Sequence, residues 1–147
     1  MHVRAVRRAV PAILCASALA ISLQASGQDK KPAKPSVTVK VSPIVGFSPA
    51  RMVLTADLKG GEESEELYCA TVEWEWGDDT RSEAKTDCDP FEAGKSEIKR
   101  HFTIDHTYNV AGEYRVEFRL KQKNKVVARG STDVKVRPGV RDPGIDR

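Results

Sequence analysis

The stretch Trp74–Thr80, WEWGDDT, holds two tryptophans two residues apart, followed by a glycine and two aspartates. Three structures could explain it: a platform on which sugar rings stack, a calcium-binding loop, or a buried strand that runs into a turn. Side chains alternate between the two faces of a strand. The preceding positions that share the parity of Trp74 are apolar or aromatic, namely Tyr68, Ala70 and Val72. The pattern therefore favours the buried strand, with both indole rings on its core side.

The residues at the alternate positions of this strand are polar. They include Glu73 and Glu75, whose carboxylates we expect to face water. Gly77, Asp78 and Asp79 follow the strand and predict a tight turn, because glycine and aspartate tolerate the backbone angles that such turns require.

A two-residue period of apolar side chains returns along the rest of the chain. It predicts strands over residues 36–41, 51–58, 68–76, 98–104, 114–121 and 126–136. Residues 47–50 are typical of a turn, 59–66 of a polar connection, and 81–99 of a long irregular loop with at most one short helix or strand. About seven strands without a convincing helix predict an all-β fold, a β-sandwich of roughly 100 residues.

The N-terminal residues indicate export. Arginines open the chain, an apolar run follows, and small residues at 25–27 form a cleavage site. The run is shorter than the roughly 20 residues of a membrane-spanning helix, although the leader could also be kept as an anchor. We therefore expect a secreted or periplasmic protein with a signal peptide over residues 1–27, a flexible linker over 28–36, one domain over 37–137 and a flexible tail over 138–147.

The charge of the chain excludes one class of partner. The whole sequence has 24 Lys and Arg against 21 Asp and Glu, and three arginines of the leader account for this excess. The remaining chain is formally neutral and lacks a basic stripe. Nucleic-acid binding needs clustered positive charge, so we do not expect a nucleic-acid partner.

The cysteines agree with export. Cys15 would leave with the leader, and the two that remain are Cys69 and Cys88. An even count in an oxidising compartment favours a disulfide between them. A metal site with His101 or His106 is the alternative, but two cysteines without a CxxC pair do not resemble a zinc framework.

Two motifs together resemble a known family. WEWGDD over residues 74–79 and HTYNVAGEYRVEFRL over residues 106–120 are similar to the PKD (polycystic kidney disease) domain, whose pattern reads WDFGDG, then HTY, a short gap, and GxYxVxLxV. The resemblance implies an immunoglobulin-like β-sandwich that serves as a secreted adhesion, spacer or recognition module without catalysis. The residues that carry it are Trp74, Trp76, Gly77, Asp78, His106, Tyr108, Gly112 and Tyr114.

The chain departs from the family pattern at three places. Asp79 replaces the usual glycine, and aspartate adopts positive φ more readily than most residues. Trp76 replaces the usual phenylalanine with a larger ring. The segment 80–105 is much longer than the family loop and contains Cys88, so a binding surface cannot simply be transferred from the family.

Two other features could indicate a functional site. His106 could be a general base, but no nucleophile motif or paired acid accompanies it, and in the family context we expect it to brace the turn through a hydrogen bond to the WEWGDD loop. The segment 61–80 contains eight acids and no Lys or Arg, and oxygen-rich clusters suit calcium. Asp78 and Asp79 are weak calcium candidates, because the segment lacks the ligand spacing of an EF-hand loop. Solvated surface charge is the default interpretation, and no other cofactor is expected.

Two functional hypotheses remain. The first is a noncatalytic binding or structural module that recognises a protein or a polysaccharide at the cell envelope. The second is an accessory domain that binds a carbohydrate or protein polymer and works with a separately encoded hydrolase. Neither requires this chain to be an enzyme, and the sequence does not identify the ligand.

Overall fold

The computed structural model describes residues 33–61 and 64–140. The predicted signal peptide, most of the predicted linker and residues 141–147 of the predicted tail lie outside the described residues. None of the helical segments among the described residues is long and apolar enough to cross a membrane.

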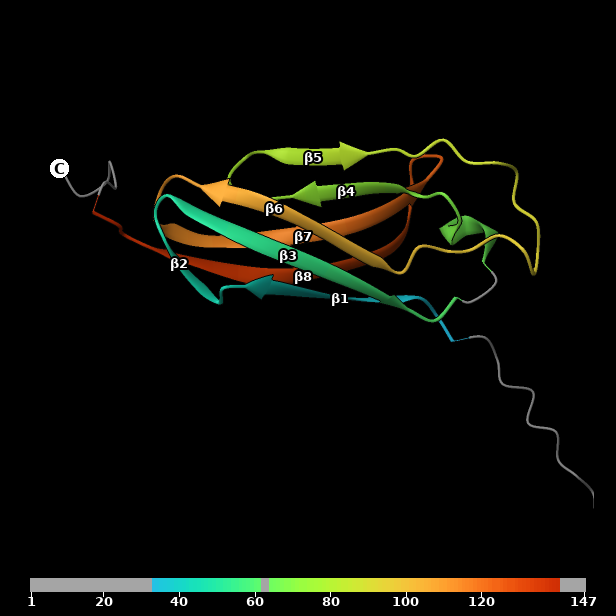
Figure 1. The fold of residues 1–147 in the computed structure, drawn as a ribbon, viewed down its shortest axis with the longest axis horizontal. Coiled ribbons are helices and arrows are strands. Elements are labelled where there is room, and N and C mark those ends of the chain that lie inside the picture. The colour runs from blue at the N-terminus through green and yellow to red at the C-terminus, as the bar shows by residue number, and fades with distance from the viewer. Residues whose placement is uncertain (1–32, 62–63, 141–147) are drawn as a thin grey trace, which may run out of the picture.

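The described chain forms two facing sheets, and this confirms the predicted immunoglobulin-like β-sandwich (Figure 1). A three-stranded antiparallel sheet has the order β1 (Ser36–Ser42), β3 (Ala50–Lys59) and β6 (His101–Tyr108). A five-stranded sheet has the order β2 (Val45–Phe47), β8 (Lys125–Arg137), β7 (Gly112–Gln122), β4 (Thr71–Glu75) and β5 (Arg81–Ala84). All neighbours pair antiparallel except β2 and β8. A single 3-10 turn, η1 (Glu65–Leu67), is the only helix in the described part of the chain.

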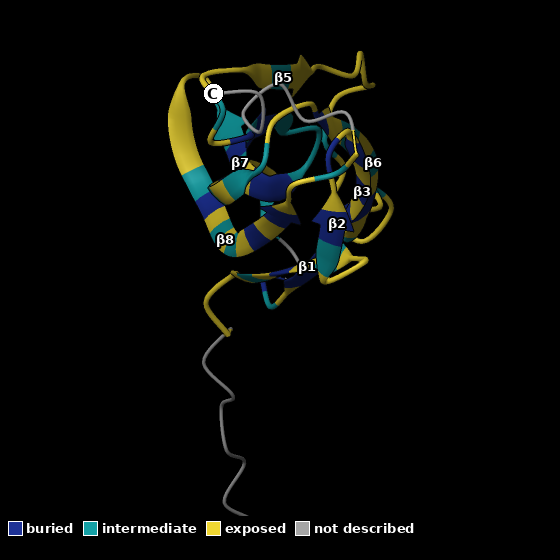
Figure 2. Cartoon of the chain, turned by 90° about the vertical axis from the view of Figure 1, so that its left-hand side faces the viewer, coloured by how far each residue is buried: buried dark blue, intermediate teal, exposed yellow. Residues whose placement is uncertain are grey.

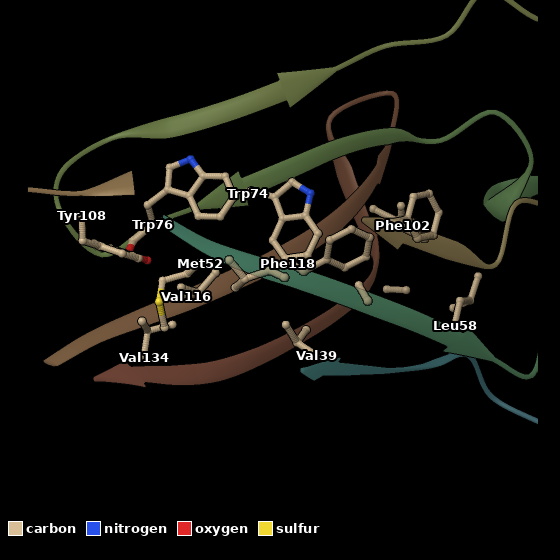
Figure 3. Close-up of a cluster of buried hydrophobic side chains, with 14 of the residues drawn as sticks. Val39, Met52, Leu58, Trp74, Trp76, Phe102, Tyr108, Val116, Phe118 and Val134 are labelled. Atoms are coloured by element: carbon tan, nitrogen blue, oxygen red, sulfur yellow. The ribbon is translucent and has the colours of Figure 1, made fainter. Parts of the chain in front are cut away.

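The alternation seen in the sequence becomes the core of the sandwich. Every second residue of β3 from Ala50 to Leu58 is buried. Buried and exposed residues alternate in this way along the strands (Figure 2). Phe118 of β7 packs against Trp74 of β4, with ring centroids 4.7 Å apart (Figure 3). Trp74 is 2% exposed and Trp76 is 1% exposed, so both indole rings lie in the core as predicted. Burial of such large aromatic side chains is a main source of stability in a sandwich.

Two strands start three residues later than predicted. The strand predicted from Tyr68 starts at Thr71, because η1 buries Leu67 and the chain turns at Cys69, where φ is 52°. The strand predicted from Ile98 starts at His101, although Ile98 is itself buried. In both places the alternation of apolar residues extends beyond the hydrogen-bonded strand. It does so because a side chain can also be buried where the backbone is irregular.

The segment 45–50 contains a strand that was not predicted. Val45–Phe47 forms the short strand β2, which pairs in parallel with the end of β8, and Ala50 already belongs to β3. A strand of three residues is too short to show a two-residue period, so the sequence reads only as a turn.

Candidate functional site

The turn after β4 is built as its sequence predicts. Gly77 has φ of 79° and Asp79 has φ of 65°, the left-handed region that glycine and aspartate tolerate best. A Cβ atom at Gly77 would lie 2.8 Å from the carbonyl oxygen of Arg115, so backbone from β7 also excludes a side chain there. The Thr80 hydroxyl and backbone N–H both donate to Oδ1 of Asp78, which closes the turn.

His106 of β6 holds this turn from the opposite sheet. Its Nε2 lies 2.7 Å from Oδ2 of Asp78, and its ring stacks on Trp76 with centroids 4.4 Å apart. The Tyr108 hydroxyl donates to the backbone oxygen of Trp76 at 2.9 Å. Burial raises the pKa of Asp78, but the hydrogen bonds from Thr80 and His106 outweigh it, and the net pKa lies below the ordinary value. The motif residues therefore join the two sheets at one end of the sandwich.

The remaining motif residues lie beside this cluster. Tyr114 stacks on Tyr108 at 4.2 Å and donates its hydroxyl proton to the oxygen of Val110 at 2.6 Å. Gly112 lies against the Tyr114 ring, and a Cβ atom at this glycine would come within 3.1 Å of the nearest ring carbon. Burial raises the pKa of the Tyr108 phenol, which keeps it a neutral donor. Hydrogen bonds and ring stacking in this cluster connect β6 to the turn after β4 and to the start of β7.

The calcium hypothesis finds no additional ligands. Both carboxylate oxygens of Asp78 are engaged, Oδ1 by Thr80 and Oδ2 by His106. Across residues 33–61 and 64–140, no three His, Cys, Asp or Glu side chains are grouped so that they could hold a metal ion. Asp78 therefore serves the turn in this structure.

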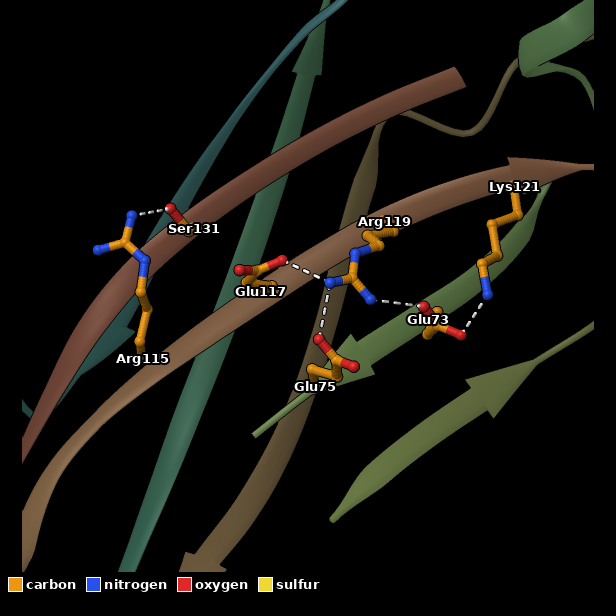
Figure 4. Close-up of polar contacts among 7 residues, drawn as sticks. All are labelled: Glu73, Glu75, Arg115, Glu117, Arg119, Lys121 and Ser131. Carbon is orange, nitrogen blue, oxygen red and sulfur yellow. Dashed lines mark hydrogen bonds and ion pairs between the residues drawn. The ribbon is translucent and has the colours of Figure 1, made fainter. Parts of the chain in front are cut away.

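A charge network covers the outer face of the five-stranded sheet and corrects one prediction. Glu73 was expected to face water, but its side chain is only 4% exposed. Arg119 donates to Glu73 at 3.1 Å, to Glu75 at 2.7 Å and to Glu117 at 2.6 Å, and Lys121 donates to the second oxygen of Glu73 (Figure 4). The parity of the strand was right, but long cations from β7 lie over the carboxylate and exclude water. Lys121 and Arg119 together hold the pKa of Glu73 below its ordinary value of 4.5, although burial opposes them.

This network predicts acid sensitivity that depends on Glu73. Its pKa is lower in the folded chain, so its stabilisation is complete above the unfolded pKa and is lost as pH falls through the folded pKa. We expect Glu73→Gln to cost about 1–3 kcal/mol at neutral pH. Between about pH 5 and pH 3, the free energy of unfolding of Glu73→Gln should fall less steeply than that of the wild type. Urea denaturation at constant ionic strength measures both curves.

Glu97→Gln is the matched control for this prediction. Glu97 is exposed and has no ion pair within the described residues, so its substitution removes the same charge without breaking a contact and should not reproduce the effect of Glu73→Gln. Parallel curves for wild type and Glu73→Gln would show that the network does not couple folding to protonation.

A groove opens along the side of the sandwich where the two sheets diverge. It has a volume of about 310 Å³ and lies between β4 and β5 of one sheet and β6 of the other. Its floor is apolar and its rim is polar. The floor includes Val72, Trp74, Phe102, Ile104 and Leu120, and the rim includes Ser82, Glu83, Thr86, Glu97, Lys99 and Thr103. Such a combination of apolar floor and few polar groups is typical of a ligand site.

The predicted disulfide forms one end of this groove. Cys69 and Cys88 are bonded, with their Cα atoms 6.2 Å apart, and both line the groove. The bond fixes the long segment after β5 to the turn before β4. Tyr68 and Phe91 add a ring contact with centroids 5.4 Å apart beside it. The insertion that departs from the family pattern therefore shapes this groove.

Both long walls of the groove are edge strands. β5 ends the five-stranded sheet and β6 ends the three-stranded sheet. The N–H of Leu58 donates to the oxygen of Arg100, so these two residues form a hydrogen-bonded pair that extends the ladder between β3 and β6. Bonded and non-bonded pairs alternate along an antiparallel ladder, so the backbone groups of Thr103 and Asp105 point away from β3. The sequence pattern does not reveal the groove, because the groove depends on where the two sheets separate. The only signal available was a cysteine in an unusually long loop.

No family model matches the sequence of this chain, and no curated protein matches it. Several solved structures are similar to it, including the following two. The CARDB domain of a Pyrococcus furiosus protein, solved in complex with di-metal ions, is 20% identical and covers 71% of this chain and 93% of its own, with a TM-score of 0.44. A superoxide reductase (neelaredoxin) from Ignicoccus hospitalis is 13% identical and covers 71% of this chain and 83% of its own, with a TM-score of 0.42. Scores this low carry no argument about function, so the proposed function rests on the residues of this chain.

Proposed function

We propose that this chain is a secreted, noncatalytic PKD-like module that binds a protein ligand at the cell envelope. The groove between β5 and β6 carries the proposal, because it combines an apolar floor with two strand edges. The signal-like leader and the Cys69–Cys88 bond support export, since disulfides persist in oxidising compartments. The stacked joint around His106 supports the PKD-like assignment.

A protein ligand suits this groove better than a polysaccharide. Sugar rings stack on exposed aromatic faces, but Trp74 and Trp76 are buried. An extended peptide can instead place alternate side chains on the apolar floor and donate backbone hydrogen bonds to a strand edge. β6 offers such an edge along the groove, next to Phe102 and Ile104. We therefore assign the ligand to the class of extended, partly apolar protein segments.

Filling the groove tests this assignment. Ala84 is exposed and lines the groove, so Ala84→Arg should block it without removing a core contact. Ala93 is also exposed but does not line the groove, so Ala93→Arg is the matched control with the same change of size and charge. Binding of the full chain is measured against an array of extended peptides with alternating apolar side chains and against a panel of soluble polysaccharides.

We expect the wild type and Ala93→Arg to bind a subset of the peptides equally. Ala84→Arg should weaken that binding at least about tenfold, since it removes the apolar contacts of the floor. Peptide binding that survives Ala84→Arg would place the ligand elsewhere. Binding to polysaccharides alone would favour the accessory-domain hypothesis.

A further inference from the structure

The β4–β5 ladder determines which residues of β5 have backbone groups that point to its open edge. The N–H of Trp76 donates to the oxygen of Thr80, and the β4–β5 register continues this pairing to Trp74 with Ser82. Residues directly opposite each other in an antiparallel ladder alternate between bonded and non-bonded pairs. The backbone groups of Arg81 and Glu83 therefore point away from β4, toward the open edge of the sheet.

The side chains along this edge alternate in charge. Arg81 and Glu83 are exposed and lie on the same face of the strand, and Asp79 and Lys85 flank them. None of these four forms an ion pair with the described residues, whereas Glu75 on the neighbouring strand is bound by Arg119. Arg81 and Glu83 thus carry both unused backbone groups and uncompensated side-chain charges.

We propose that β5 pairs antiparallel with β5 of a second copy of this chain, about a two-fold axis through Ser82. Arg81 of each copy then lies opposite Glu83 of the other, and the two residues exchange their free backbone hydrogen bonds. The same axis brings Lys85 of each copy toward Asp79 of the other. The contact is isologous, as the interfaces of two-fold dimers are, and it joins the two five-stranded sheets into one.

Charge selects this register from those that the backbone allows. Only registers that place outward-pointing residues opposite one another can form hydrogen bonds. Centring the pair on Arg81 would oppose two arginines, and centring it on Glu83 would oppose two glutamates. Like charges directly opposite each other destabilise a sheet, and opposite charges stabilise it. Of the registers centred on Arg81, Ser82 or Glu83, only the one centred on Ser82 makes both pairs complementary. Centring on Ala84 would also oppose Glu83 and Lys85, but it would pair fewer residues of β5.

The neighbouring strand adds a second reason. Within one copy, Glu83 lies directly opposite Glu73 in the β4–β5 ladder, so two carboxylates share one face. Arg119 and Lys121 already compensate Glu73. Arg81 of the second copy would lie on the free side of Glu83 and compensate it in turn.

Charged side chains on an edge strand can also serve only to prevent aggregation. The edge of β6 fits that role, because its outward-pointing ionisable side chains already have partners: Asp105 is bound by Arg51 at 3.0 Å, and His101 lies 2.8 Å from Asp57. β5 differs in that its charges attract in the register that pairs most of the strand and repel when that register shifts to Arg81 or to Glu83. It lies at the outside of the molecule, where the end of the sheet is open (Figures 1 and 2). Because β5 is short, we expect a weak, concentration-dependent dimer.

Charge exchange tests the pairing by sedimentation velocity of the full chain over a wide range of concentrations, without any ligand. Arg81→Glu and Glu83→Arg should each weaken dimerisation at least about tenfold, because each reverses two symmetric contacts. The double variant restores complementarity and should recover the wild-type dissociation constant. Arg129→Glu, an exposed arginine of β8, is the control for net charge and should change nothing.

A backbone variant separates the hydrogen bonds from the charge, with Glu83→Gln as the control that loses the same charge but keeps the N–H. Glu83→Pro removes an N–H that points to the open edge, so the β4–β5 ladder should persist, as proline is tolerated on edge strands. It should abolish dimerisation while the far-ultraviolet circular dichroism stays that of the wild type. A wild type that stays monomeric at all concentrations, a double variant that fails to recover, or a folded Glu83→Pro that still dimerises would overturn the pairing. These outcomes do not depend on peptide binding in the groove.

Discussion

Replacement of Trp76 by alanine is expected to lower the free energy of unfolding by about 3–5 kcal/mol, the range for removing a buried aromatic side chain. The indole is 1% exposed, stacks on His106 and donates from Nε1 to the Ser82 hydroxyl at 3.1 Å. Its loss would leave a cavity between the sheets and remove the surface on which His106 is held. Equilibrium denaturation by urea measures the change.

Trp76→Phe is the matched control. Phenylalanine is the usual residue of the PKD pattern at this position, and it keeps an aromatic ring against His106 while losing the bond to Ser82. We expect it to cost about 1–2 kcal/mol, which combines the lost hydrogen bond with the smaller ring. Equal costs for the alanine and phenylalanine variants would contradict the role given to ring packing in this joint.

Removal of the disulfide by Cys69→Ala together with Cys88→Ala is expected to lower the free energy of unfolding by about 3 kcal/mol. The bond joins residues 19 positions apart, and its loss frees the unfolded chain to sample more conformations. Ile98 is buried and should keep the end of the segment after Cys88 in place. The residues before it lose their covalent attachment, so we expect them to open locally. Thermal and urea unfolding measure the global cost, and amide hydrogen exchange locates the opening.

The chemical reduction of the wild type is the control for this pair of substitutions. It breaks the same bond without changing a side chain, so it should reproduce both the lower stability and the faster exchange over residues 85–97. Unchanged exchange in that segment after loss of the bond would show that other contacts hold the end of the groove. Thiol titration under denaturing conditions confirms that the bond is present at the start.

The sandwich could be predicted from the sequence because its strands carry their own signal. β3 and β7 alternate so regularly that the buried face is fixed by local pattern alone. Gly77 and Asp79 mark a turn with positive φ, which few other residues adopt. The pairing of Cys69 with Cys88 followed from counting cysteines. Each of these properties depends on residues close together in the chain or on one pair.

Features that need contacts between distant segments could not be predicted. Glu73 is buried because Arg119 and Lys121, more than forty residues later, reach over it from β7. β2 exists because the end of β8 lies beside it. The groove lies where the edge of β6 separates from the edge of β5. The alternation of residues along a strand carries no information about the distance between two strand edges.

Side-chain periodicity therefore established the all-β class, the buried tryptophans and the motif turn, since parity along a strand settles which face a residue occupies. It could not establish how deeply a residue on the outer face is covered or which strand becomes a free edge. Those properties arise from packing and from strand order, in which β5 and β6 end their sheets. The proposed binding site and the proposed dimer contact both depend on these two edges.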